Sequence, residues 1–233
     1  MELPVYIKIH NQIRKDIEAG KWAVGDRIPS ERELALDFGV SRMTLRQAIQ
    51  TLVDEGILER RIGAGTYVAN KKVQEKMSGV TSFTDLMLNQ GKKPSTKTIS
   101  YHVADPSLSE IEKLKLPDDA QILRMERIRY ADDVPICFEV ATIPYSLVKG
   151  FSKAEITHSF CHTLETKGHY ELGGAQQNVS AMVASEKIAE YLKIKKGDAI
   201  LRLRQISFLK SKEPFEYVRT QYVGERFEFY LER

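Results

Sequence analysis

Two groups of arginines in this sequence are spaced so that they could bind anions or nucleobases. Arg42 and Arg46 lie four residues apart, with Thr44 between them. On a helix this spacing places both guanidiniums on one face, where they can donate paired hydrogen bonds to guanine or to phosphate oxygens. Arg127 and Arg129 are two residues apart, so on a strand they share one face of a sheet.

The sequence around Arg42 predicts two short capped helices that meet at a glycine. Ser30 and Glu33 form a capping box at the start of the first helix, and Gly39 supplies the left-handed residue that ends it. Ser41 then caps the second helix. The apolar positions of that helix repeat with helical spacing and are Leu45, Ala48, Ile49, Leu52 and Val53. In a helix-turn-helix, the N-terminal residues of the second helix enter the major groove.

A basic hairpin is expected directly after these helices. Residues 57–60 and 65–68 are predicted as strands around the tip Gly63-Ala64-Gly65. Because glycine has no side chain, such a tip can approach a groove closely. With Arg32 in the first turn of the first helix, the segment predicts a winged helix-turn-helix that binds DNA. The alternative, a solvated charged face on an ordinary helical hairpin, leaves the glycine-tipped hairpin unexplained.

Charge and composition limit the partners and the compartment. The 233 residues include 35 Lys and Arg against 32 Asp and Glu, a net charge of only +3. DNA affinity should therefore depend on individually placed arginines and on two half-sites rather than on a broad basic field. No apolar run is long enough to span a membrane, and residues 1–4 lack the build of a signal peptide. Two cysteines, Cys137 and Cys161, favour a reducing cytoplasm and argue against zinc.

The second part of the chain contains a duplication. Residues 107–116 and 122–125 match residues 185–194 and 200–203 at an offset of 78 positions. Each copy continues with a polar turn, a proline and another strand, so each copy predicts a short helix, a long strand, a hairpin and a strand. Two copies give an α+β fold, with one antiparallel sheet, helices beside it and a cleft between the halves.

The polar stretch before the duplication is expected to separate two domains. We predict a DNA-binding domain at residues 1–70, a linker at 71–78 and a sheet domain at 79–233. The two halves of the sheet domain are not equivalent, because Gln205 and Ser207 stand in the second copy where the first copy has its arginine pair.

Acidic residues accompany the arginines of the predicted sheet. Glu139 and Glu216 lie early in the second strand of each hairpin and could accept hydrogen bonds from hydroxyls or an amine. Two guanidiniums facing a core are costly without an anion, which favours a phosphate-sized ligand. The alternative is that Arg127, Arg129 and these glutamates simply pair with each other, and the residues alone leave both interpretations open.

These segments resemble the GntR family of bacterial transcription regulators. Residues 4–70 are similar to its winged-helix domain, through Ile28-Pro29-Ser30-Glu31-Arg32 and Val40-Ser41-Arg42-x-Thr44-x-Arg46. Residues 78–233 resemble the effector domain of its HutC subfamily, the UTRA domain with a chorismate-lyase-like fold. The motifs that carry this second resemblance are Ser82-Phe83-Thr84, Arg127-x-Arg129, Pro135-x-x-x-Glu139, Ser159, Pro214-x-Glu216-Tyr217 and Tyr222.

The resemblance implies which residues contact DNA and effector. The implied DNA contacts are Arg32, Arg42, Thr44, Arg46 and Gly65. A phosphate on the effector would be held by Ser82, Phe83, Thr84, Arg127, Arg129 and Ser159. The sugar would be read by Glu139, Glu216 and Tyr222. Ser82 would also cap a helix whose N-terminal amides assist the phosphate.

The implied function is that of a cytoplasmic homodimeric repressor of sugar or amino-sugar utilisation genes. It would bind a palindromic DNA operator and respond to a phosphorylated sugar, without a cofactor. Two departures bear on the choice of sugar, since Cys161 replaces a common tyrosine and Val223 a common arginine at or near the pocket.

Three alternatives remain from the sequence. One is a regulator that senses an anionic metabolite other than a sugar, and another is an architectural DNA binder without a ligand. The third is a lyase-like enzyme in which Arg127, Arg129 and Glu139 polarise a substrate. Against an enzyme, no nucleophile–base pair or glycine-rich phosphate loop is evident. His158 and His162 have the spacing of some metal ligands, but no third ligand is evident, so we expect no metal site.

Overall fold

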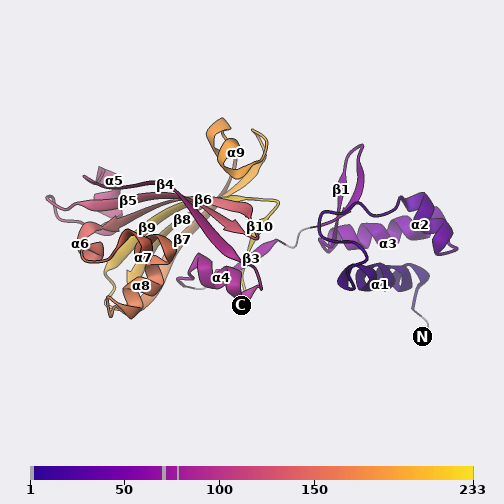
Figure 1. Cartoon of the computed structure of the whole chain (residues 1–233), viewed down its shortest axis with the longest axis horizontal. Helices are drawn as coiled ribbons and strands as arrows, with labels where there is room; N and C mark the ends of the chain where they lie inside the picture. Colours follow the sequence, from indigo (N-terminus) through magenta and orange to yellow (C-terminus); the bar gives the residue numbers. More distant parts are fainter. Residues whose placement is uncertain (1–2, 70–71, 78, 233) are drawn as a thin grey trace. The chain divides into compact units, whose positions relative to one another are not determined.

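The structure is a computed structural model that describes residues 3–69, 72–77 and 79–232. The chain divides into two compact units, residues 1–71 and 72–233. The elements of the first unit are α1 (Val5–Glu18), α2 (Glu31–Asp37), α3 (Arg42–Asp54), β1 (Leu58–Arg61) and β2 (Gly65–Val68), all visible in Figure 1. This is the predicted pair of helices behind an opening helix, followed by the predicted hairpin.

Side-chain caps fix the starts of α2 and α3, as the sequence predicts. The Ser30 amide donates to the Glu33 carboxylate at 2.8 Å, and the Glu33 amide donates to the Ser30 hydroxyl at 3.3 Å. The Ser41 hydroxyl accepts the Thr44 amide, and Gly39 ends α2 at a φ of +62°. The apolar faces of α1 and α3 then pack into one core. Its fully buried members include Ile13, Leu45, Ala48, Ile49 and Leu52.

The second unit is a six-stranded antiparallel sheet with helices on both faces and a small parallel strand pair. Its strands are β3 (Val73–Lys76), β4 (Pro94–Ala104), β5 (Ile122–Ala131), β6 (Val134–Pro144), β7 (Leu172–Val183), β8 (Ala199–Leu209), β9 (Pro214–Val223) and β10 (Phe227–Tyr230). Its helices are α4 (Phe83–Asn89), α5 (Leu108–Leu114), α6 (Tyr145–Val148), α7 (Lys153–His158), α8 (Phe160–Thr166) and α9 (Glu186–Leu192).

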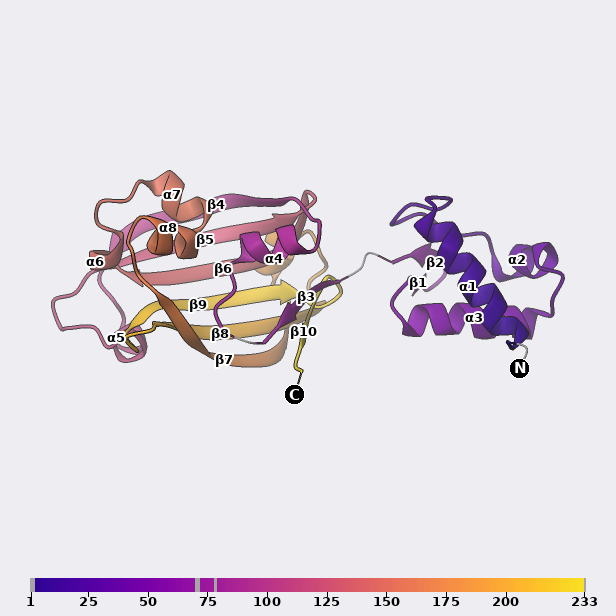
Figure 2. The same cartoon turned by 90° about the horizontal axis from the view of Figure 1, so that it is seen from below.

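The strand order β4-β5-β6-β9-β8-β7 places the two sequence copies symmetrically about the β6–β9 pair. Figure 2 shows the six strands side by side in this order. Each copy contributes an edge strand, a short helix and a hairpin, so the predicted antiparallel sheet built from a repeat is confirmed. The helices of the repeat, α5 and α9, both end in a left-handed lysine, Lys115 or Lys193.

Two features of this unit differ from the sequence expectation. The edge strands β4 and β7 were not predicted. They are half-buried or exposed along their length, and in β4 the apolar alternation is confined to residues 99–103. Part of the expected linker is strand β3, which pairs in parallel with β10. Its inward positions are Val73 and Glu75, and the acidic residue at the second of them conceals the strand pattern. Residues 70, 71 and 78, at the expected boundaries, lie outside the described residues.

One buried carboxylate joins α5 to the sheet. Glu110 accepts hydrogen bonds from the amide and hydroxyl of Ser107, from Arg124 Nη2 at 2.7 Å and from Thr142 Oγ1 at 2.9 Å. Burial opposes ionisation, but these donors outweigh it and lower the pKa of Glu110 to about 2. The second copy has Ile188 at the matching position. The short helix of one half is therefore held to the sheet by a carboxylate, and that of the other half by an apolar side chain.

We expect Glu110→Gln to lower the free energy of unfolding by about 2 kcal/mol or more, because Arg124 would lose its ionised partner. Urea denaturation of the full chain measures this change. The matched control is Glu112→Gln, which removes the same charge from an exposed position on the same helix. Equal denaturation midpoints for the two variants would contradict the structural role of Glu110.

Candidate functional sites

The first unit presents arginines from three elements around one open hollow. The hollow lies between α2, the start of α3 and the hairpin, and its arginines are Arg27, Arg46, Arg60 and Arg61. Glu31 connects two of them, since Arg46 Nε donates to Glu31 Oε2 at 3.1 Å and Arg60 Nη2 donates to Oε1 at 3.0 Å. A single carboxylate thus holds the α3 arginine and a hairpin arginine together, facing solvent.

The other predicted DNA-contact residues lie at the N-terminal ends of α2 and α3. Arg32 and Arg42 are exposed in the first turns of these helices. Thr44 is half-buried, and its hydroxyl lies 2.9 Å from the Ser41 hydroxyl. Arg32, Arg42 and Arg46 are therefore solvent-facing, while Thr44 has only part of its side chain accessible.

Gly65 occupies a position that only glycine fills without strain. Its φ is +117°, and a Cβ at this position would lie 2.7 Å from Arg27 Nε. The residue starts β2 rather than forming the tip, which consists of Ile62, Gly63 and Ala64. The absence of a side chain at Gly65 therefore lets Arg27 lie against the hairpin. Arg27 was not predicted as a site residue, and its side chain lies at the hollow because Gly65 leaves room for it.

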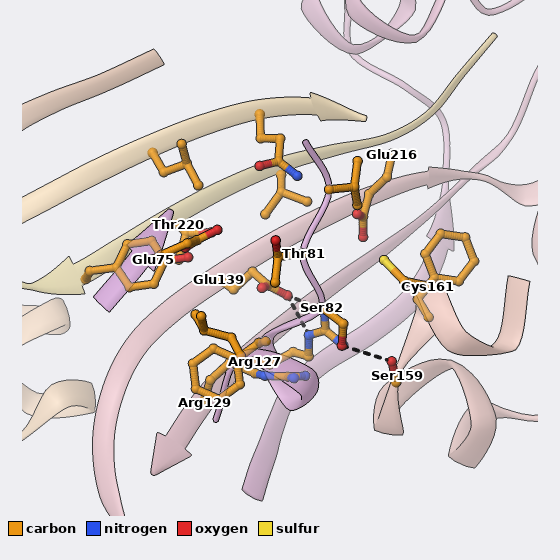
Figure 3. A pocket seen from close by; sticks show the side chains of 18 residues that line it. Glu75, Thr81, Ser82, Arg127, Arg129, Glu139, Ser159, Cys161, Glu216 and Thr220 are labelled. Carbon is orange, nitrogen blue, oxygen red and sulfur yellow. Dashed lines mark hydrogen bonds and ion pairs between the residues drawn. The ribbon is translucent and has the colours of Figure 1, made fainter. Parts of the chain in front are cut away.

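The second unit contains a pocket between its two halves. Its floor is the sheet face formed by β5, β6, β9 and β8, and its walls come from α4 with the residues before it and from the start of α8 (Figure 3). The predicted residues that line it are Ser82, Phe83, Arg127, Arg129, Glu139, Ser159, Glu216 and Tyr222. Thr84 lies just outside, against Arg129, so the structure brings the whole predicted set together.

The two arginines of the floor have different partners. Arg127 forms an ion pair with Glu139, with Nε donating to Oε1 at 2.7 Å and Nη2 donating to the same oxygen. Arg129 pairs with neither glutamate. It lies over the Phe83 ring, 4.6 Å from the ring centroid, and Nη2 donates to the Thr84 hydroxyl at 3.3 Å.

Arg129 is only 3% exposed, yet its Nε and Nη1 have no hydrogen-bond partner among the described residues. Burial and then the charge of Arg127 lower the pKa of Arg129 to about 10, so it remains a cation at neutral pH. An unpaired buried cation is costly, and an anion entering the pocket would supply the missing partner. Of the two interpretations left open by the sequence, mutual pairing holds for Arg127 and fails for Arg129.

Two serines converge beside this cation from different elements. The Ser82 hydroxyl lies 3.2 Å from the Ser159 hydroxyl. Ser82 stands at the N-cap position of α4, but its side chain makes no cap hydrogen bond, so the predicted side-chain cap is wrong. Ser159 accepts the His162 amide at the start of α8. The Ser82 hydroxyl therefore bonds to Ser159 rather than to an amide of α4, at a position that lines the pocket.

Two acidic side chains of the pocket have raised pKa values. Burial, followed by repulsion from Glu139, raises the pKa of Glu216 to about 7 even though both arginines lower it. The same two causes raise the pKa of Glu75 to about 7. Glu139 differs, because Arg127 and Arg129 outweigh the effect of burial and lower its pKa. Glu75 was not selected from the sequence, since its strand was expected to be a linker.

The two expected departures from the family pattern have different positions. Cys161 lines the pocket, and burial raises the pKa of its thiol. Val223 does not line it but packs on the opposite sheet face, with Ile188 and Leu192 of α9. The expectation that Val223 touches the pocket is therefore wrong, because side chains alternate along a strand and Tyr222 takes the inward position.

Comparison with known proteins identifies the chain. Residues 5–68 match the bacterial regulatory proteins of the gntR family, and residues 89–228 match the UTRA domain. The chain is 32% identical to the HTH-type transcriptional repressor NagR of Bacillus subtilis (strain 168), a match covering 99% of this chain and 96% of that protein. This chain is a member of the GntR family.

Two further relatives of this GntR regulator bear on its architecture. It is 27% identical to the mannosyl-D-glycerate transport/metabolism system repressor MngR of Escherichia coli (strain K12), over 98% of this chain and 95% of that one. It is also 63% identical to a GntR-family transcriptional regulator of known crystal structure from Enterococcus faecalis V583. That match has a TM-score of 0.57 and covers 60% of this chain and 100% of the other.

The family membership decides between the classes of function. The GntR regulator is a DNA-binding transcription regulator that responds to a small molecule through its UTRA domain, and it is not an enzyme. The lyase-like enzyme considered from the sequence is therefore set aside. Within the part of the chain that the structure describes, no helix is long and apolar enough to cross a membrane.

The raised pKa of Glu216 has a consequence for stability. Since its folded-state pKa of about 7 exceeds the ordinary value of 4.5, the folded protein holds this proton more tightly. The free energy of unfolding should then fall as the pH rises from about 4.5 to about 7. We expect Glu216→Gln to be more stable than the wild type at pH 8, by roughly 3 kcal/mol, and equal to it near pH 4.

Urea denaturation across this pH range measures the difference. Glu213→Gln, at an exposed position in the same hairpin, serves as the matched control and should follow the wild-type curve. A Glu216→Gln variant that is less stable at pH 8 would show that the carboxylate has a stabilising partner.

Proposed function

We propose that this regulator is a homodimeric repressor of sugar or amino-sugar utilisation genes whose DNA affinity is lowered by a phosphorylated sugar. The proposal rests on one observation above all, the buried unpaired guanidinium of Arg129 in a pocket that also contains carboxylates and hydroxyls. A phosphate provides oxygens for the cation, and sugar hydroxyls suit the acidic side chains. The relative MngR, named for mannosyl-D-glycerate, supports a sugar-related effector.

We assign DNA contact to Arg32, Arg42, Thr44, Arg46 and Gly65. The three arginines and Thr44 lie on the N-terminal turns of α2 and α3, the part of a helix-turn-helix that meets the major groove. Gly65 contributes through the close approach of the hairpin backbone. In this assignment a phosphate or guanine replaces Glu31 as the partner of Arg46. Arg60 shares the Glu31 carboxylate with Arg46, so its ion pair changes as well.

The small charge of the chain supports a dimer. With a net charge of +3, one subunit has few cations to neutralise phosphates, so two subunits on a palindrome supply the affinity that one lacks. Residues 1–70 form the DNA-binding domain in this proposal. The effector domain comprises the residues from 79 onward together with strand β3.

We assign the phosphate of the effector to Arg129, Arg127, Phe83, Thr84, Ser82 and Ser159. We assign its remaining groups to Glu139, Glu216 and Tyr222. The cavity is small, with a volume of about 60 Å³, so in this proposal a sugar phosphate displaces the residues before α4 or the side chains around it. Effector binding therefore changes the structure of the pocket wall, as a ligand-driven shift between two states requires.

A second candidate effector is an anionic metabolite other than a sugar. Arg129 alone would suit any phosphate or carboxylate, whereas Glu139 and Glu216 favour a ligand that carries hydrogen-bond donors. Isothermal titration with glucose 6-phosphate, glucosamine 6-phosphate and inorganic phosphate separates the two. Binding of a sugar phosphate at least tenfold tighter than phosphate supports the sugar, and equal affinities would contradict it.

We expect Arg46→Gln to weaken operator binding about tenfold or more, because one base or phosphate contact is lost. The operator is a DNA fragment selected from random sequences by the wild-type protein, and fluorescence anisotropy measures the affinity. Arg14→Gln makes the same charge change on the exposed face of α1 and should weaken binding less than about threefold. Equal losses would reduce the role of Arg46 to its charge alone.

We expect Arg129→Gln to weaken sugar-phosphate binding tenfold to a hundredfold, as loss of a charge-assisted hydrogen bond does. The melting temperature of the unliganded variant should stay equal or rise, since a buried unpaired cation is removed. Arg204→Gln is the control, because Arg204 is exposed on β8. Calorimetry of both variants measures the affinities. A variant that loses stability but binds normally would make Arg129 structural.

The function as a whole is tested by effector-driven release of DNA. Labelled operator bound to the full-length wild-type protein is titrated with each sugar phosphate. A rise in the dissociation constant of at least fivefold is expected for the cognate compound. If none of a broad set of sugar phosphates changes operator affinity, the sensing part of the proposal is wrong.

A further inference from the structure

Glu75 is a pocket residue that lies between the two segments matched by the family models. Those matches end at residue 68 and resume at residue 89. On β3, Val73 and Glu75 point inward and Gln74 and Lys76 point outward. Glu75 is only 6% exposed and lines the pocket. A carboxylate thus occupies a position at which the strand pattern calls for an apolar side chain.

This carboxylate has no hydrogen bond or ion pair among the described residues. Burial and repulsion from Glu139 raise its pKa to about 7. Glu110, whose side chain is also shielded from solvent, shows the opposite case, because four donors surround it and its pKa is lowered. A buried carboxylate with no donors lowers the stability of the fold, so packing gives no reason for a glutamate at position 75.

Neither arginine of the pocket floor forms an ion pair with Glu75. Arg127 is paired with Glu139, and Arg129 lies over Phe83. The charge of Glu75 contributes to the raised pKa values of Tyr222 and Cys137, whereas the charge of Glu216 contributes to the raised pKa of Cys161. In Figure 3 Glu75 accordingly lies beside Thr220, and Glu216 lies on the other side of Glu139.

We propose that Glu75 is an effector-binding residue that selects ligands carrying an ammonium group in addition to their anionic group. This inference rests on the proposed function, in which the anionic group of the same ligand binds Arg129. Once that anion is bound, the described pocket offers no cation to Glu75. A protonated amine would donate hydrogen bonds to it and neutralise its charge.

The position of Glu75 also links the ligand to the chain segment that leads to the winged helix. β3 is the first strand after residue 69, the last described residue of the first unit. The side chain of Gln90, at the end of α4, bonds the backbone of Gln74 in both directions, at 3.1 and 2.8 Å. A ligand that contacts Phe83 on α4 and Glu75 on β3 therefore acts on this strand from two sides.

The test compares two probes that differ in one group. Glucosamine 6-phosphate carries an ammonium where glucose 6-phosphate carries a hydroxyl. Their affinities for the full-length protein are measured by calorimetry at pH 7, for the wild type, Glu75→Gln and Glu75→Asp. Glu225→Gln is the matched control, since it removes a carboxylate from an exposed position in the turn after β9.

We expect Glu75→Gln to weaken glucosamine 6-phosphate binding about tenfold to a hundredfold and glucose 6-phosphate binding less than about threefold. Glu75→Asp should keep part of the preference, and Glu225→Gln all of it. The melting temperature of unliganded Glu75→Gln should equal or exceed that of the wild type at pH 8, which shows that the variant folds. Release of the operator by glucosamine 6-phosphate should be lost in Glu75→Gln and kept in Glu225→Gln.

Three results would overturn the inference. In the first, Glu75→Gln binds glucosamine 6-phosphate as tightly as the wild type. In the second, it loses affinity for both probes equally, which would remove the selection for an ammonium. In the third, the wild type binds neither probe nor any other sugar phosphate. That result alone would overturn the proposed function as well, so the two failures are distinguishable.

Discussion

A buried guanidinium without a carboxylate partner is the constraint on which the effector domain depends. Arg127 and Arg129 share one sheet face, and the one carboxylate directly opposite, Glu139, pairs with the first of them. The matching positions of the second copy hold Gln205 and Ser207, which bond to each other at 2.9 Å and need no ion. The repeat thus produces a sheet whose halves differ in charge, and the pocket lies where they meet.

The same pocket is bonded to β3, the first strand of the effector domain. The start of α4 supplies the ring and hydroxyl that touch Arg129, and its far end is bonded to the backbone of β3 through Gln90. Phe227 of β10, the partner strand of β3, stacks on Tyr222 of the pocket floor with ring centroids 3.9 Å apart. Any ligand that moves α4 or Tyr222 therefore acts on the strand that continues toward the winged helix.

Local signals made the first unit and the repeat predictable. Ser30, Glu33, Gly39 and Ser41 determine helix boundaries through their own side chains or backbone, so a sequence reveals them directly. Strand β3 has no such signal, because its inward position is acidic, and its pairing with β10 joins residues about 150 positions apart. Resemblance and spacing predicted which residues line the pocket. They did not predict which of the two arginines has a carboxylate partner, because that depends on strand register.

We propose that a ligand in the pocket lowers the affinity of the protein for its operator. The most direct test is reciprocal: the affinity of a cognate sugar phosphate is measured for the free protein and for the protein saturated with operator. We expect it to be weaker on DNA, by the same factor by which the ligand weakens operator binding, at least fivefold. Equal affinity for the free and the DNA-bound protein would contradict the account.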